Sequence, residues 1–318
     1  MKRTVMAFAC FALVSIAVKA QMGQIVLHHQ GAVSVFANDK MEDAMTKAVD
    51  GDTIYLSEGS FSGNMNITKK VSIIGAGYNT VYLGTINIDI PGEPTLTARL
   101  LDAMDIQAVI EVKQACKGMV IRKCKFRTII FSAKTEDATI DRCWCFGTGA
   151  NGFKLSDNIK GVVVLNSRVR SISGDASPST INFMHCNIKL IYNVSGASVF
   201  ASYTNCIIAG WYYTDSSFYT NTVFRYCLCG QSYYSKSDYN YCWNYNNTSI
   251  LNDNCYCSLS DADLQAKGYI GNDGTVVGCT GGENPYTLTP AVPRVTEHTI
   301  TVDTEKKELN VNIKVTTN

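Results

Sequence analysis

The feature that most constrains the fold is a short pattern that recurs through the middle of the chain about every 20 residues. Each copy reads apolar, any, apolar, any, a corner residue that is often Asn, a small residue that is usually Cys, any, apolar. The intervals between the small residues are 19, 24, 19, 20 and 16. Such a period, with insertions of variable length, is typical of a solenoid. The six small residues are Cys124, Cys143, Ser167, Cys186, Cys206 and Thr222.

Each copy also predicts a bend in the backbone. Alternate residues of a strand share one face, yet Ile121 and Cys124 are three residues apart, so the chain must turn between them to bury both. Asn occupies the bend at Asn166, Asn205 and Asn221, and Asn tolerates the left-handed conformation that such a corner requires. Two short strands joined by a one-residue corner describe one coil of a parallel β-helix. Helical repeats would need 3.6-residue periodicity, and a β-sandwich would not repeat the same corner.

The two ends of the repeat region predict caps. Residues 39–49 have apolar positions at helical spacing after Asp39, which can serve as the N-cap, and this helix can cover the open end of the solenoid. After three prolines, the alternating residues around a charged turn predict a hairpin within 285–318. We therefore expect three parts, namely a signal peptide at 1–20, a capped parallel β-helix at 21–284 and a β-appendage at 285–318.

The first twenty residues have the pattern of a secretory signal peptide. Lys2 and Arg3 precede a short apolar run, which ends near a cleavage site at Ala20. The run is shorter than the ~20 residues that span a bilayer. Removing residues 1–20 takes Lys2, Arg3 and Lys19 from the 28 basic residues and leaves 25 against 27 acidic ones, a net charge of −2. We expect a secreted, periplasmic or cell-surface protein that does not bind nucleic acid through bulk charge.

Two segments near the start carry a resemblance to a known superfamily. Residues 52–61 (DTIYLSEGSF) and 67–77 (ITKKVSIIGAG) resemble the first coil of pectin-lyase-like right-handed parallel β-helix proteins, and the likeness extends over about residues 37–284. Residues 271–286 look like the closing segment of exported β-helix proteins of Bacteroidetes. The resemblance implies an all-β, right-handed, single-stranded parallel β-helix. It fixes no reaction, because the superfamily includes lyases, hydrolases, esterases and adhesins.

Twelve cysteines remain after Cys10 leaves with the signal peptide. Four of them, Cys124, Cys143, Cys186 and Cys206, occupy equivalent coil positions, which favours an internal ladder of small apolar side chains. Disulfides remain an alternative for the group Cys227, Cys229, Cys242, Cys255 and Cys257. The C-x-C spacing does not match the usual zinc motifs, so we expect no metal and no cofactor.

The candidate catalytic residues are Asp141, Arg142 and Arg122. The lyases of the superfamily use acids that hold calcium together with a basic residue, so calcium is expected only if the protein is a lyase. The hydrolases use several carboxylates on adjacent coils. Neither set of motifs is present here. Asp141 beside the basic patch around Arg122 is the best acid, and a salt bridge on the solenoid surface is the alternative interpretation.

Aromatic residues are dense between residues 211 and 245 and alternate with Ser, Asn and Asp. Aromatic rings with neighbouring amides and hydroxyls are what sugar stacking requires. About half of these rings would point into the core of a solenoid. The predicted glycan-contacting residues are Trp211, Tyr212, Tyr213, Tyr233, Tyr234 and Trp243.

These observations lead to one functional expectation and two alternatives. We expect an exported monomer that binds polysaccharide or a cell-surface glycan without catalysis. A polysaccharide lyase or glycoside hydrolase is the first alternative, and an adhesin or structural surface protein is the second. An enzyme would bring acids and a base together in one groove across adjacent coils, whereas a binding protein would expose an aromatic surface.

Overall fold

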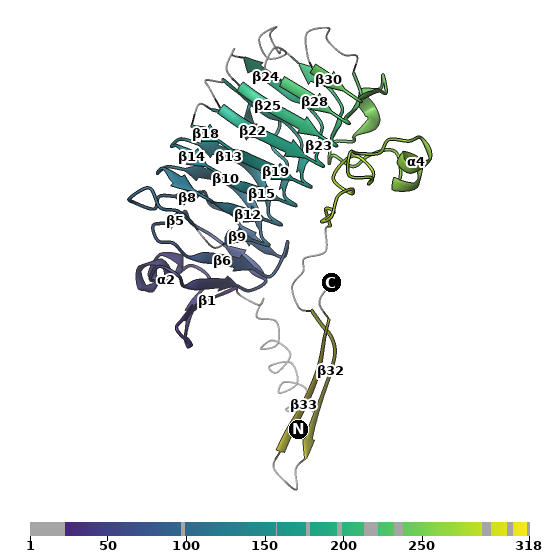
Figure 1. The fold of residues 1–318 in the computed structure, drawn as a ribbon. Coiled ribbons are helices and arrows are strands. Elements are labelled where there is room, and N and C mark those ends of the chain that lie inside the picture. Colours follow the sequence, from purple (N-terminus) through teal and green to yellow (C-terminus); the bar gives the residue numbers. More distant parts are fainter. Residues whose placement is uncertain are drawn as a thin grey trace, which may run out of the picture.

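The chain forms a parallel β-solenoid of about 8 turns (Figure 1). The structure, a computed structural model, describes residues 23–96, 99–156, 158–175, 179–195, 199–212, 222–231, 238–287, 294–303 and 308–316. Two large sheets run along the solenoid, and each coil adds strands to both of them. The predicted all-β solenoid is therefore confirmed.

Sheet A contains 12 strands and carries the first arm of each coil. Its first three strands pair antiparallel, and every later neighbour pairs parallel. In spatial order the strands are β2 (Ala32–Ala37), β1 (Gln24–His29), β3 (Thr53–Leu56), β6 (Ser72–Gly75), β9 (Arg99–Asp102), β12 (Val120–Arg122), β15 (Thr139–Asp141), β19 (Val162–Leu165), β22 (Ser179–Met184), β25 (Val199–Thr204), β28 (Thr222–Arg225) and β30 (Asp238–Asn240).

Sheet B contains 16 strands and carries the second arm of each coil, which is split by a bend in most coils. Its strands are β4 (Gly59–Phe61), β5 (Met65–Ile67), β7 (Thr80–Tyr82), β8 (Ile86–Ile88), β10 (Asp105–Val112), β13 (Lys125–Phe131), β16 (Trp144–Cys145), β17 (Phe153–Lys154), β20 (Arg168–Val169), β21 (Ile172–Asp175), β23 (Asn187–Ile188), β24 (Ile191–Ser195), β26 (Ile207–Ile208), β27 (Trp211–Tyr212), β29 (Leu228–Cys229) and β31 (Trp243–Asn244).

Smaller elements complete the chain. Sheet C joins three short strands of successive coils, and a separate antiparallel hairpin lies in the C-terminal region, where it was predicted. These strands are β11 (Cys116–Lys117), β14 (Thr135–Glu136), β18 (Ile159–Lys160), β32 (Arg294–Asp303) and β33 (Glu308–Thr316), and the helical elements are α2 (Met41–Lys47), α4 (Asp261–Ala266), η1 (Gly149–Asn151) and η2 (Thr248–Ile250).

One residue per coil turns the chain from sheet A into sheet B, and we call this set the corner row. Every member has a positive φ, between 44° and 57°, which is the left-handed region that costs energy for most side chains. The predicted corners Asn166 and Asn205 are confirmed. The corner row comprises Ala103, Lys123, Arg142, Asn166, His185, Asn205, Tyr226 and Tyr241.

The sixth repeat copy differs in register from the prediction. Thr222 begins strand β28 and pairs with Ala201, whereas the turn comes four residues later at Tyr226 and is followed by Cys227. The predicted corner Asn221 lies outside the described residues. Tyr at a corner gave no signal, because it is not a residue type that favours the left-handed conformation.

The residues that follow the corners point into the core. Most of them are cysteines, and we call this set the thiol row. Its cysteine thiols lie within hydrogen-bond distance of main-chain carbonyl oxygens, as for Cys186 Sγ and Val164 O at 3.4 Å. Burial raises the pKa of the thiols of Cys124, Cys143, Cys206 and Cys227. All twelve described cysteines are free, which agrees with the ladder interpretation rather than with disulfides. The thiol row comprises Met104, Cys124, Cys143, Ser167, Cys186, Cys206, Cys227 and Cys242.

The N-terminal cap exists, but its start differs from the prediction. Helix α2 begins at Met41, and its N-cap is Lys40, which makes no side-chain capping hydrogen bond. Asp39 is therefore not the cap. The buried Met41, Ala44 and Met45 lie on one helical face, and α2 packs on β1, β2 and β5 at the first end of the solenoid (Figure 1).

Residues 251–287 do not form another coil, and we call them the strap. The strap crosses the outside of the solenoid at the corner row and carries helix α4 (Figure 1). A second apolar cluster joins Leu264 and Val277 of the strap to Ile207 and Leu228 on the outer face of sheet B. The strap thus covers the later coils on one side.

Candidate functional site

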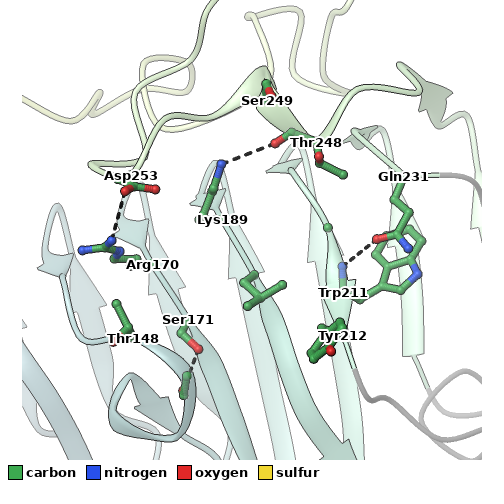
Figure 2. Close-up of a pocket in the computed structure, with 13 residues that line it drawn as sticks. Thr148, Arg170, Ser171, Lys189, Trp211, Tyr212, Gln231, Thr248, Ser249 and Asp253 are labelled. Carbon is green, nitrogen blue, oxygen red and sulfur yellow. Dashed lines mark hydrogen bonds and ion pairs between the residues drawn. The ribbon is translucent and has the colours of Figure 1, made fainter.

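A pocket of about 660 Å³ opens where sheet B bends in the later coils (Figure 2). Three successive bends form its floor: Arg170–Ser171 between β20 and β21, Lys189–Leu190 between β23 and β24, and Gly210 before β27. The loops that contain η1 and η2 supply further lining residues, among them Thr148 and Thr248. The site therefore depends on the stacking of coils, because no single coil contains more than a part of it.

Tyr212 supplies an exposed aromatic ring to the pocket. Its side chain is 51% exposed, and its ring stacks on that of Tyr192 in the preceding coil, with centroids 6.0 Å apart and planes at 17°. The parallel register of β24 and β27 aligns the two residues and therefore sets this stack. An exposed ring backed by a second ring is a rigid apolar platform of the size of a sugar face.

Trp211 has a different role from the one predicted. It is only 5% exposed, and its ring is tilted against Phe224 in the core. Its main-chain N–H donates to Gln231 Oε1 at 3.0 Å, and its indole Nε1 is buried without a hydrogen-bond partner among the described residues (Figure 2). Trp211, predicted to contact a glycan, thus lies in the pocket wall, where its burial leaves little of its ring open for stacking.

Two cations and one anion lie around the pocket. Arg170 forms an ion pair with Asp253 at 3.3 Å, and Asp253 is largely exposed. Lys189 Nζ donates to the carbonyl oxygens of Thr248 and Leu251, which anchors the η2 loop to the solenoid. Ser171 Oγ donates to Gly149 O at 2.7 Å and fixes the opposite loop. The charged groups thus hold the η2 side of the pocket, and a hydroxyl holds the η1 side.

The remaining predicted aromatic residues do not join this platform within the described chain. Trp243 packs edge-on against Tyr269 of the strap, with centroids 5.6 Å apart. Tyr213, Tyr233 and Tyr234 lie outside the described residues. Phe224 of the same region points inward and extends a stacked column that Phe183 and Tyr203 of earlier coils form in the core.

The three catalytic candidates come together, but as ion pairs at the corner row. Arg142 Nη2 lies 2.6 Å from Asp141 Oδ2, and Arg122 Nη2 lies 2.9 Å from Asp102 Oδ2 in the coil before. Lys123 lies near both arginines, and burial together with these two cations lowers its pKa. None of the three candidates lines the pocket. This arrangement matches the salt-bridge interpretation, with each carboxylate already occupied by an arginine.

A buried arginine that the sequence analysis did not single out connects the strap to the solenoid. Arg168 is fully buried, and its guanidinium lies 4.3 Å from the ring centres of Trp144 and Tyr256 and 4.5 Å from that of Tyr286. It donates to Asn254 O and to the Tyr286 hydroxyl. The partners lie 86 and 118 residues away in sequence, so no local pattern could have revealed this aromatic cage.

Among the described residues, no group of three or more His, Cys, Asp or Glu side chains is placed to hold a metal ion. Within the same residues, no helix has the length and apolar character needed to cross a bilayer. No protein-family model, curated protein or solved structure matches the chain. The functional argument therefore depends on the geometry of the site.

Proposed function

We propose that this is an exported, non-catalytic β-solenoid that binds polysaccharide in the pocket between the η1 and η2 loops. The observation that carries the proposal is the Tyr212 ring, which is half-exposed at the pocket and stacked on Tyr192. Thr148, Ser171 and Thr248, which carry hydroxyl groups, line the same pocket. An aromatic platform with nearby hydroxyls suits the apolar face and polar edge of a sugar ring.

The proposal includes the origin suggested by the sequence. The apolar N-terminal segment supports export, residues 52–61 and 67–77 support descent from the pectin-lyase-like superfamily, and residues 271–286 support an origin in Bacteroidetes. The stacked parallel coils are compatible with that superfamily. Export itself is tested by finding the mature N-terminus near Gln21 in protein recovered from outside the cytoplasm.

The test of binding uses residues 21–318 and a panel of plant, microbial and host polysaccharides in affinity electrophoresis. We expect retardation by at least one glycan, and Tyr212→Ala should weaken it by roughly 5- to 30-fold, because a stacked ring contributes about 1–2 kcal/mol. The matched control is Tyr55→Ala, since Tyr55 is 45% exposed on β3 and lies outside the pocket. Absence of retardation by every glycan would overturn the proposal and favour an adhesin or structural role.

A catalytic alternative is favoured by one observation. Asp253 lies in the same pocket as Arg170 and Lys189, so an acid and basic groups are present together. The same incubations, followed for unsaturated and reducing-end products with and without calcium, separate the two functions. Product that disappears in Asp253→Asn would establish a lyase or hydrolase, whereas binding without product supports the proposed function.

A further inference from the structure

The last two cysteines of the thiol row differ from the others in their access to solvent. Cys227 and Cys242 follow the last two members of the corner row and lie in the final coils, at the end of the solenoid away from α2 (Figure 1). Cys227 is buried like the earlier cysteines of the row, whereas Cys242 is partly exposed. A small reagent in solution therefore meets the row first at Cys242.

The register of the final coils places these two cysteines opposite each other. Strands β29 and β31 pair in parallel, with Leu228 opposite Trp243. The residues that precede this pair are Cys227 and Cys242, so they occupy matching positions on neighbouring coils. Neighbouring strands lie about 4.8 Å apart, and the Cα atoms of a disulfide are usually separated by roughly 4.4–6.8 Å. The coil spacing therefore suits a disulfide between these positions.

Direct contacts bring the two side chains together. The main-chain N–H of Cys227 donates to Cys242 Sγ at 3.3 Å. Burial raises the pKa of the Cys227 thiol, and a hydrogen bond with the Cys242 side chain opposes part of this rise. Cys229, the other cysteine of the same strand region, lies opposite Asn244 instead. Cys227 is therefore the thiol in register with Cys242.

We propose that Cys227 and Cys242 form an intramolecular disulfide when the protein meets a low-molecular-weight disulfide such as oxidised glutathione. The Cys242 thiolate attacks one sulfur of the oxidant, which releases one glutathione thiol and leaves a mixed disulfide on Cys242. The Cys227 thiolate then attacks the Cys242 sulfur and releases the second glutathione thiol. The two cysteines are thereby oxidised, and the glutathione disulfide is reduced to two thiols. The structure, in which no disulfide joins them, shows the reduced form.

Oxidation leaves the nearby hydrogen-bond acceptors satisfied. Cys227 Sγ lies 3.4 Å from Arg225 O, and Cys242 Sγ lies 3.6 Å from Asn240 O. Each of these two carbonyl oxygens also accepts a main-chain N–H of the preceding coil at 3.0 Å. Losing the two S–H donors therefore leaves both carbonyl oxygens paired, and it replaces two buried or half-buried thiols with an apolar bond.

The disulfide fastens the last coil to the coil before it. It closes a loop whose ends are 15 positions apart, which favours the folded state because it restricts the unfolded chain. Strand β31 follows Cys242 and leads to η2, whose Thr248 lines the pocket. The oxidised form therefore holds the η2 side of the pocket more firmly than the reduced form. Formation of the disulfide does not depend on the proposed glycan binding.

Peptide mapping under non-reducing conditions tests the proposal. Residues 21–318 are reduced, freed of reductant, incubated with oxidised glutathione at about pH 8, alkylated and digested. We expect two peptides joined through Cys227 and Cys242, and the thiols titrated in denaturant should fall from twelve to ten. Retention of all twelve thiols overturns the proposal. It is equally overturned by a glutathione adduct that persists on Cys242 or by a disulfide from Cys242 to another cysteine.

Two serine variants separate the effect of register from that of exposure. Cys242→Ser should keep all of its remaining thiols through the same treatment. Cys257→Ser is the matched control, because Cys257 is the other partly exposed cysteine, and this variant should still lose two thiols. Serine already occupies the row at Ser167, so Cys242→Ser is expected to fold. Loss of two thiols in Cys242→Ser, or of none in Cys257→Ser, contradicts the pairing.

Hydrogen exchange measures the consequence for the last coil. After oxidation, the amides of β30, β31 and η2 should exchange about tenfold or more slowly than in the reduced protein, because the disulfide opposes local opening of this coil. Cys242→Ser, treated in the same way, should show no such change. If mapping locates the disulfide but exchange stays the same, the inferred effect on the η2 side of the pocket is wrong.

Discussion

Two stretches of the corner row have the same backbone and different side chains. Lys123 and Arg142 have φ of 51° and 52°, and Asn166, His185 and Asn205 have φ between 44° and 56°. Of the first two, Arg142 forms an ion pair with Asp141, and Lys123 lies beside Arg122 and Arg142. The last three bind the strap. The left-handed turn is required by the coil, whereas the residue that makes it depends on what lies outside.

The strap-facing corners have polar side chains that bind backbone and side-chain groups of the strap. Asn166 Nδ2 donates to Gly281 O at 2.7 Å, and Asn205 Nδ2 donates to Asn272 Oδ1 at 2.8 Å. The ring nitrogens of His185 lie 2.7 Å from Asp273 Oδ2 and 3.3 Å from Gly278 O. In this stretch Asn serves twice, since it tolerates the turn and also holds the strap.

The largest effect is expected from removing the cation that fastens the strap. Arg168→Ala should lower the free energy of unfolding by about 3–4 kcal/mol, because it leaves a cavity among three rings and deprives Asn254 O and the Tyr286 hydroxyl of their donor. Urea denaturation measures the change. Arg225→Ala, at an exposed arginine of β28, is the control and should change stability by less than about 0.5 kcal/mol.

Acid should loosen the strap before it unfolds the coils around Lys123 and Arg142. Burial acts to raise the pKa of Asp273, but hydrogen bonds from Thr275 and His185 outweigh it and hold this pKa below its usual value. A carboxylate with a lowered pKa stabilises the folded state above its unfolded-state pKa, and this stabilisation is lost as the pH falls through the folded-state pKa. After allowance for solvent screening, we expect a loss of about 1 kcal/mol.

Hydrogen exchange of the strap amides, followed from neutral to acidic pH, checks this expectation. The protection of the amides in residues 271–282, relative to their intrinsic exchange rates at each pH, should fall below about pH 4, the usual range of Asp, ahead of that of the coils. Asp273→Asn should show faster exchange at neutral pH and a weaker response to acid. An unchanged acid response in Asp273→Asn would assign the loosening to another group.

The smallest effect sharpens the comparison within the corner row. Lys123→Asn should stabilise the protein by about 0.5–1 kcal/mol, because Asn adopts the left-handed conformation more easily and the substitution removes a nearly buried amine beside two arginines. Thermal unfolding measures the shift. The control is Lys160→Asn, which removes a charge from the regular strand β18 and should not stabilise the protein. Equal gains in stability from both variants would show that the loss of charge, rather than the left-handed turn, is the cause.

The coil was predictable from the sequence because its determinants are local. The positions of Asn166 and Asn205 and the spacing of the cysteines repeat within about 20 residues, so one chain shows them several times. The register failed at Tyr226, where an aromatic residue rather than Asn makes the turn. The prediction that Asp39 caps the helix was wrong, because a good capping residue does not ensure that the backbone enters the helix there.

The site was predictable only in part, because it depends on which ring of an aromatic pair faces outward. Trp211 and Tyr212 are adjacent, so a strand must bury one and expose the other, and the sequence does not say which. The strap was missed for a different reason. The partners of Asn166, His185 and Asn205 lie 67 to 115 residues away, and their own segment has no repeat to mark it.

The strap also determines the order in which the chain can fold. Coil-to-coil hydrogen bonds join residues about 20 positions apart, so stacking can extend one coil at a time along the chain. Arg168 finds Tyr286 only after a further 118 residues, and the contact between Tyr78 and Tyr286 spans 208. A nascent solenoid therefore exists for a period with its Arg168 and Asn166 side chains uncovered. The contacts of Tyr286 therefore form late in folding, because they join residues far apart in the sequence. Once formed, they make the unfolding of the solenoid cooperative from its second coil to its last.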